Sequence, residues 1–203
     1  MPSAGFGAKI DVKLKVDKLK ELAEKLKSLA QMEVYVGIPE SASKRPGEEV
    51  NLAQLLFIHT NGSELRNIPK RPVIEPAIEA EDNKERITKE LGDAARALLE
   101  GRPTAVKKSL HQAGKLGRDA AKNWFTDPRN NWPPDKRETI RRKLMKLEGE
   151  TRKIALAAIY SNATSFMLDG EMVNIDTPLI DTAVMQGSIR YIVVEKGSVE
   201  EAP

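Results

Sequence analysis

The stretch from Pro103 to Trp124 reads PTAVKKSLHQAGKLGRDAAKNW and carries a strong helical signal. Proline at a first-turn position costs little, because the N–H that it lacks would have no intrahelical partner there. Apolar residues then recur at helical spacing, at Val106, Leu110, Leu116 and Ala120. We therefore predict a long helix over residues 103–124. Gly114 and Gly117 lack the full spacing of a phosphate-binding loop, so we interpret them as helix surface.

Working outward, the same periodicity predicts a helix from about Ala77 to Gly101 and another from about Leu19 to Ala30, with Asp17 as its N-cap. A shorter helix over residues 51–59 is predicted to end at Asn61-Gly62. A basic helix is predicted over residues 135–145. Two stretches are expected to break the helices: the proline-rich connection 68–76 and the segment 125–135.

Strand signals are few. Ile10, Val12, Leu14 and Val16 alternate with charged residues, which predicts a half-buried strand. Further strands are expected over residues 32–38 and 188–195, with a turn at Gly187, and a hairpin around Asp169-Gly170 is one interpretation of residues 167–174. The predicted fold class is α+β: a small mixed or antiparallel sheet packed with long helices in a single domain over residues 1–195, followed by an acidic, flexible tail at 196–203.

Composition excludes several functional classes. The chain has 203 residues and no cysteine, so thiol nucleophiles, disulfides and iron–sulfur clusters are impossible. Aromatic residues make up only 4%, which disfavours a single-strand nucleic-acid binder built on stacking. The sequence shows neither a membrane-spanning apolar run nor a signal peptide, so we expect synthesis in a cytoplasm and no membrane partner.

Charge is unevenly distributed along the chain. Residues 101–143 hold twelve Lys or Arg against four Asp or Glu, a local charge of +8. Residues 164–203 hold two basic residues and seven acidic ones, a local charge of −5. Such polarity suits either nucleic-acid contact or complementary faces in an assembly, and solvated helix and loop faces are the alternative interpretation.

No set of residues indicates catalysis. The two histidines, His59 and His111, lie 52 residues apart without a carboxylate or second histidine at ligand spacing. No serine stands in a nucleophile elbow, and no carboxylate pair has a spacing that requires acid–base chemistry. We therefore expect no enzyme activity, no metal and no cofactor.

Three segments in this order carry a resemblance to a known family. The first motif segment, residues 68–78, reads IPKRPVIEPAI; the second, residues 131–143, contains NWPP and TIRRK; the third, residues 178–191, contains PLIDT and SIRY. This series resembles the virion-morphogenesis and tail-completion family of tailed bacteriophages. Val73 stands where the family usually has Phe, Ala183 stands where it usually has Gly, and residues 144–174 resemble an insertion.

The resemblance implies a minor structural protein of the phage virion at the head–tail connection, as a neck, collar or tail-completion protein. It implies a homo-oligomeric ring around the DNA channel, other neck, connector or tail proteins as partners, and possible nonspecific contact with the DNA. The candidate contact residues for assembly or the DNA channel are Arg71, Trp132, Arg137, Arg141, Arg142, Asp181, Thr182 and Arg190. The alternative is a basic nucleic-acid-binding regulator that uses residues 101–143, although the proline-rich break fits a helix-turn-helix poorly.

Overall fold

The computed structural model describes residues 6–29, 31–161, 163–179 and 183–195, with side chains from residue 18 onward. The chain divides into two compact units. The first unit consists of Met1–Val36, Ile78–Arg118 and Tyr191–Pro203, and the second of Gly37–Ala77 and Asp119–Arg190. Helices dominate, with two small two-stranded sheets, so the fold class is α+β as predicted. The single domain over residues 1–195 stays a prediction.

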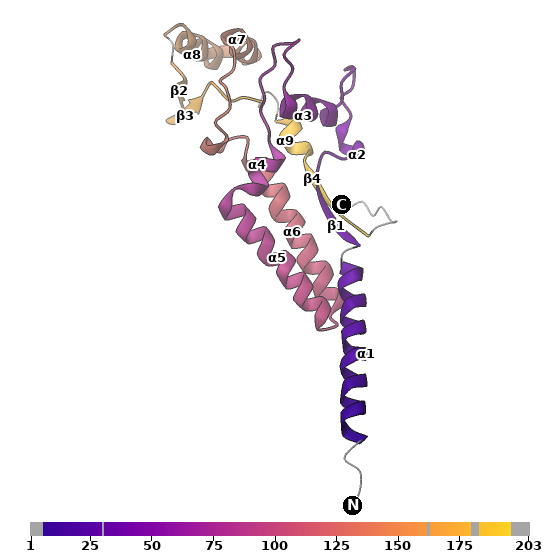
Figure 1. The fold of residues 1–203 in the computed structure, drawn as a ribbon. Helices are drawn as coiled ribbons and strands as arrows, with labels where there is room; N and C mark the ends of the chain where they lie inside the picture. The colour runs from indigo at the N-terminus through magenta and orange to yellow at the C-terminus, as the bar shows by residue number, and fades with distance from the viewer. Residues whose placement is uncertain (1–5, 30, 162, 180–182, 196–203) are drawn as a thin grey trace, which may run out of the picture. The chain divides into compact units, whose positions relative to one another are not determined.

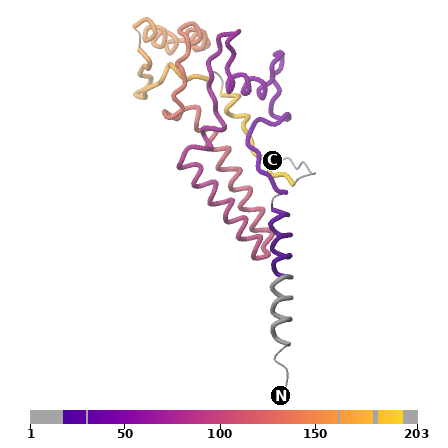
Figure 2. The backbone as a smooth tube through the Cα atoms, in the orientation of Figure 1, coloured from indigo at the N-terminus to yellow at the C-terminus, as the bar shows by residue number. Residues whose placement is uncertain are grey.

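Long helices form the core of the first unit. α5 (Glu81–Leu99) and α6 (Pro103–Asn123) are joined by a tight turn at Gly101, whose φ of 71° suits glycine. The backbone runs along α5 and returns beside it along α6, and α1 (Phe6–Leu29) packs against α5 (Figures 1 and 2). The buried residues between these elements are Ala94, Ala97, Val106 and Leu110. The helix predicted over residues 103–124 is thereby confirmed.

Two strands complete this unit. β1 (Met32–Gly37) pairs with β4 (Arg190–Glu195), and Val34 and Val193 pack on the helical core. A methyl group added at Gly114 would lie 2.3 Å from the ring of Tyr191. Both glycines of α6 are in fact buried, so their interpretation as helix surface was wrong: glycine is needed at position 114 for close approach of the final strand.

The strand predicted over Ile10–Val16 was also wrong, because these residues belong to helix α1, and Asp17 lies inside that helix instead of capping it. No glycine or proline separates residues 9–16 from the Lys-, Leu- and Glu-rich stretch that follows, so one helix continues through both. Alternation alone specifies a strand weakly, because strand stability depends on a pairing partner.

The second unit begins with short helices. α2 (Glu40–Ser43) lies in residues 40–49, which the mixture of Ser, Lys, Arg, Pro and Gly predicts to be a loop, so that prediction was wrong for these four residues. α3 (Leu52–Asn61) begins at a capping box in which Asn51 and Gln54 bond each other's backbone N–H, and it ends at Gly62 with a φ of 71°, as predicted. α4 (Ile74–Glu79) is followed by Ala80, whose φ of −56° and ψ of 130° are not helical, so the single helix expected from Ala77 is interrupted before α5 begins.

The rest of the second unit holds a cluster of its own. The 3-10 turn Pro128–Asn130 interrupts the helices as expected, and α7 (Arg137–Leu144) is the predicted basic helix. α8 (Gly149–Tyr160) packs on β2 (Ser165–Leu168), which pairs antiparallel with β3 (Glu171–Asn174). Together with α7, these elements bury Leu144, Ala155, Phe166 and Ile175. The hairpin turns at Asp169 and Gly170, both with positive φ, which confirms the hairpin interpretation.

The short helix α9 (Val184–Ser188) precedes β4 and contains Gly187, where a turn was expected. Ala183, at its N-terminus, has a φ of 55°, in the left-handed region that favours glycine. Within the described residues, no helix is long and apolar enough to cross a membrane.

Candidate functional site

A buried ion pair lies at the centre of the second unit. Arg71, in the proline-rich connection, is only 6% exposed, and its Nη2 lies 3.0 Å from Oδ1 of Asp135. The same guanidinium donates hydrogen bonds to the backbone carbonyl of Pro133, at 2.7 and 3.2 Å, and to that of Pro134, at 3.1 Å. A planar fork of donors is what arginine supplies and lysine does not. Arg71 therefore holds the first motif segment against the second.

Lys143 of α7 supplies a second cation to the same carboxylate. Its Nζ lies 2.7 Å from Oδ2 of Asp135 and also 2.7 Å from the carbonyl oxygen of Thr177. The backbone N–H of Asp135 donates to Oδ1 of Asp176 at 2.9 Å. Asp135 thus joins the connection, the α7 helix and the strand-to-helix segment near residue 177, and its side chain is 4% exposed.

Trp132 makes a second connection between the first and second motif segments. Its indole Nε1 donates to the carbonyl of Pro72 at 3.1 Å, and its ring meets that of Phe125 edge to face, with centroids 5.9 Å apart. Val73, next to Pro72, is completely buried. The first and second motif segments, about 60 residues apart in sequence, are therefore bonded in both directions, through Arg71 and through Trp132.

His59 of α3 stands beside the ion pair. Burial lowers the pKa of its imidazole below the usual value, the nearby Arg71 guanidinium lowers it further, and the Asp135 carboxylate opposes both effects. Its Nδ1 is buried without a hydrogen-bond partner among the described residues. Its backbone carbonyl accepts from the N–H of Arg71 at 2.7 Å, so α3 and the proline-rich connection are fixed together.

An open cleft of about 660 Å³ lies over this network. Its lining combines apolar residues, among them Leu55 and Met185, with basic ones. Six Lys or Arg residues line the cleft against two acidic residues: Lys44, Arg45, Arg71, Arg142, Lys143 and Lys146 against Glu48 and Asp135. Because Asp135 and Glu48 pair with Arg71, Lys143 and Arg45, the cleft keeps a net positive charge.

Two of these cations are available for a ligand. Lys44 follows α2 and Arg142 lies on α7; both are exposed, and neither side chain has a hydrogen bond or ion pair with another described residue. The described lining residues contain cations and a histidine but no serine or cysteine nucleophile. Among the described residues, no group of three His, Asp or Glu is placed to hold a metal ion. This chemistry suits the binding of an anion.

The predicted contact residues separate into distinct places. Arg71 and Arg142 line the cleft, and Trp132 donates to the carbonyl of Pro72, next to Arg71. Arg137 donates to the carbonyl of Ile159 at 2.9 Å, and with Arg141 it lines a different hollow beside α8.

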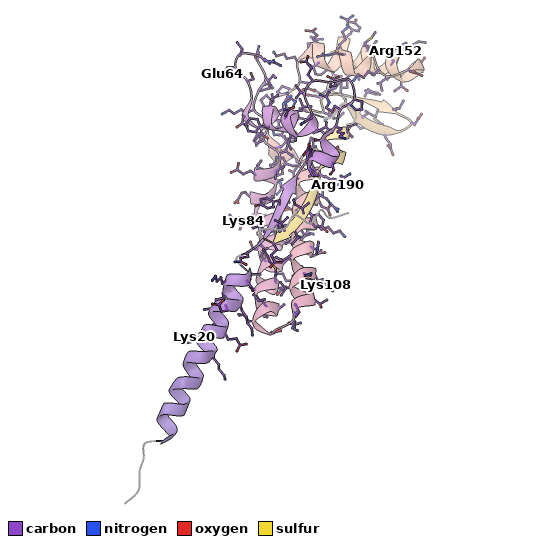
Figure 3. All side chains as sticks on the ribbon, turned by 90° about the vertical axis from the view of Figure 1, so that its right-hand side faces the viewer. Lys20, Glu64, Lys84, Lys108, Arg152 and Arg190 are labelled. Atoms are coloured by element: carbon purple, nitrogen blue, oxygen red, sulfur yellow. The ribbon has the colours of Figure 1, made fainter. Side chains whose placement is uncertain are left out.

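Arg190 is exposed at the start of β4, where Figure 3 labels it, and donates to the carbonyls of Gly187 and Ile189. Asp181 and Thr182 lie outside the described residues. Of the eight predicted contact residues, the six that the structure describes therefore lie at separate places and not on one surface.

The list of candidate contact residues omitted Asp135, Lys143, His59 and Lys44. Asp135 and Lys143 had a local signal, since both lie in the second motif segment, where Asp135 directly follows two prolines. His59 and Lys44 had none, because a lysine in a loop or a histidine in an apolar helix is recognised only by what lies opposite it in space.

Comparison with known proteins adds no assignment: no family model, no curated protein and no solved structure matches this chain.

Proposed function

We propose that this chain is a minor structural protein of a tailed-phage virion, located at the head–tail connection and assembled as a ring around the DNA channel. The observation that carries the proposal is the contact between the first two motif segments at Asp135. The first segment contributes Arg71 and the second contributes Asp135 and Lys143. Lys143 also donates to the carbonyl of Thr177, one residue before the third segment. Segments that resemble one family in order and spacing here form one packed structure.

Two departures from the family pattern support the same reading. Val73, where Phe is usual, is fully buried, so an apolar side chain is what the position requires. Ala183, where Gly is usual, has the left-handed backbone that glycine adopts without strain. Both positions keep the environment of the usual residue although the residue itself differs.

Self-association is supported by α1. Leu19, Leu22 and Leu26 recur at alternating spacings of three and four residues, the spacing of a seam between helices. All three are exposed, and Leu19 is 63% exposed. Figure 3 labels Lys20 on this part of the helix. An apolar stripe on a helix gains stability when it packs against another helix, and a second copy of the chain supplies one.

The test is the mass of the purified chain in solution, measured by analytical ultracentrifugation and followed by electron microscopy. We expect a cyclic oligomer that the double variant Leu19→Glu, Leu26→Glu abolishes. The matched control is Leu65→Glu, because Leu65 is 97% exposed outside α1 and its replacement should leave the oligomer intact. A monomer at every concentration would overturn the proposal, and a compact dimer that binds DNA would favour the regulator that uses residues 101–143.

A further inference from the structure

We propose that the cleft over Asp135 binds phosphate groups of a DNA backbone, through Lys44 and Arg142. The inference depends on the proposed function only for the source of the phosphates, since DNA passes through the channel of a head–tail connection. The cleft belongs entirely to the second unit, so its lining residues are placed with respect to one another.

The cations that line the cleft fall into two groups, those held by other residues and those without partners. Arg71 and Lys143 are held by the Asp135 carboxylate and by backbone carbonyls, and Arg45 pairs with Glu48 and donates to the carbonyl of Val50. These contacts fix the shape of the cleft. Lys44 and Arg142 are exposed at its lining without such partners among the described residues, so their charges can meet a ligand with little cost for breaking existing bonds.

The charge that the cleft presents to a ligand is positive. A carboxylate that is nearly fully buried and bonded to two cations adds little negative potential at the mouth of the cleft. Glu48 is likewise next to Arg45, at 3.7 Å. The lining therefore presents Lys44 and Arg142 as a cationic rim, which attracts a polyanion.

The cleft lining also indicates which anion fits. Among the described residues, no Phe, Tyr or Trp lines the cleft, so this lining offers no platform on which bases could stack. Point charges on a rim suit phosphates of the backbone, which are contacted independently of base sequence. An acidic protein segment is the competing occupant, and the experiment below separates the two.

The experiment measures the affinity of the full-length chain for a fluorescein-labelled 20-base-pair duplex by fluorescence anisotropy, at several concentrations of NaCl. Each phosphate contact contributes a slope of about −0.9 to the plot of log affinity against log salt. Replacing both residues, as Lys44→Gln with Arg142→Gln, should reduce the slope by about 1.8 and weaken binding about 60-fold at 0.1 M salt. Circular dichroism checks that the double variant is folded, as expected for two exposed side chains.

The matched control is Arg66→Gln. Arg66 is an exposed arginine of the second unit that does not line the cleft. It should leave both affinity and slope unchanged. Inorganic phosphate and a poly-glutamate peptide are added as competitors: displacement of the duplex only at phosphate concentrations that match the ionic-strength effect supports the backbone as the ligand.

Three results would overturn the inference. The duplex affinity could be the same in the double variant as in the wild type, poly-glutamate could bind the cleft while the duplex does not, or inorganic phosphate could compete far below its ionic-strength effect, which would indicate a small phosphate ligand. The same samples are examined for rings. Rings without duplex binding would refute this inference alone. Duplex binding without any assembly would refute the proposed function but not the proposed phosphate site in the cleft.

Discussion

Replacing Asp135 by Asn should be among the most damaging single changes in the second unit. The substitution keeps the size of the side chain and removes its charge. Arg71 and Lys143 would then keep their positive charges with side chains only 8% and 16% exposed, without the carboxylate that now lies 3.0 and 2.7 Å away. Breaking a buried ion pair from one side costs about 3–5 kcal/mol, because an uncompensated charge stays buried.

The structure places the expected loss at the lower end of that range. Arg71 would retain its bonds to the carbonyls of Pro133 and Pro134, and Lys143 would retain the carbonyl of Thr177. These dipoles compensate part of each charge. We therefore expect the free energy of unfolding to fall by about 3 kcal/mol.

The assay is urea-induced unfolding followed by tryptophan fluorescence. The chain has two tryptophans, Trp124 and Trp132, and both belong to the second unit, so the signal reports on the unit that holds Asp135. The control is Glu150→Gln, which breaks an ion pair with Lys153 whose side chains are 73% and 76% exposed. Exposed pairs contribute less than about 1 kcal/mol. A loss at Asp135 no larger than the loss in this control would refute the reasoning about the buried network.

Three further changes test other parts of the fold. Gly114→Ala should destabilise the chain by about 1–3 kcal/mol, because the new methyl would clash with the Tyr191 ring. Gly92→Ala, in an open helical position, should instead stabilise it by about 0.4–1 kcal/mol. Thermal unfolding compares the two variants, and equal shifts of the melting temperature would contradict the close contact at Gly114. Trp132→Phe removes one hydrogen bond to a backbone carbonyl and should cost about 1 kcal/mol in urea unfolding followed by circular dichroism; no change would mean that the indole N–H contributes nothing. Folding lowers the pKa of His59, so this residue contributes its full stabilisation above the ordinary pKa of 6.5 and loses it as the pH falls through and below that value. The free energy of unfolding should therefore drop between pH 7 and pH 5. Unfolding curves at several pH values measure this, and His59→Asn should flatten the dependence.

Local sequence was sufficient wherever the chemistry of a few neighbouring residues specifies the backbone. Asn51 and Gln54 form a complete capping box, so the start of α3 follows from four residues. Asp169 and Gly170 tolerate the positive φ that a two-residue hairpin turn requires. The long helix α6 follows from the apolar periodicity of its own residues. In each case the determining interactions lie within a few positions of one another.

Tertiary packing decided the features whose partners are distant in sequence. Alternation over residues 10–16 resembled a strand, but a strand needs a neighbour, and the continuous helix-forming sequence of α1 prevailed. The break at Ala80 has no local cause, since alanine favours helix. Gly114 resembled a surface residue until Tyr191, 77 positions later, was found against it.

The candidate site shows the same division. Arg71 and Trp132 could be selected from sequence because they lie in motif segments, yet their roles could not, since each bonds a residue about 60 positions away. Asp135 is one carboxylate among many in a chain with 30 acidic residues. Burial between Arg71 and Lys143 makes it the centre of the second unit, because two cations and a carboxylate removed from water stabilise the fold only when all three meet in one place.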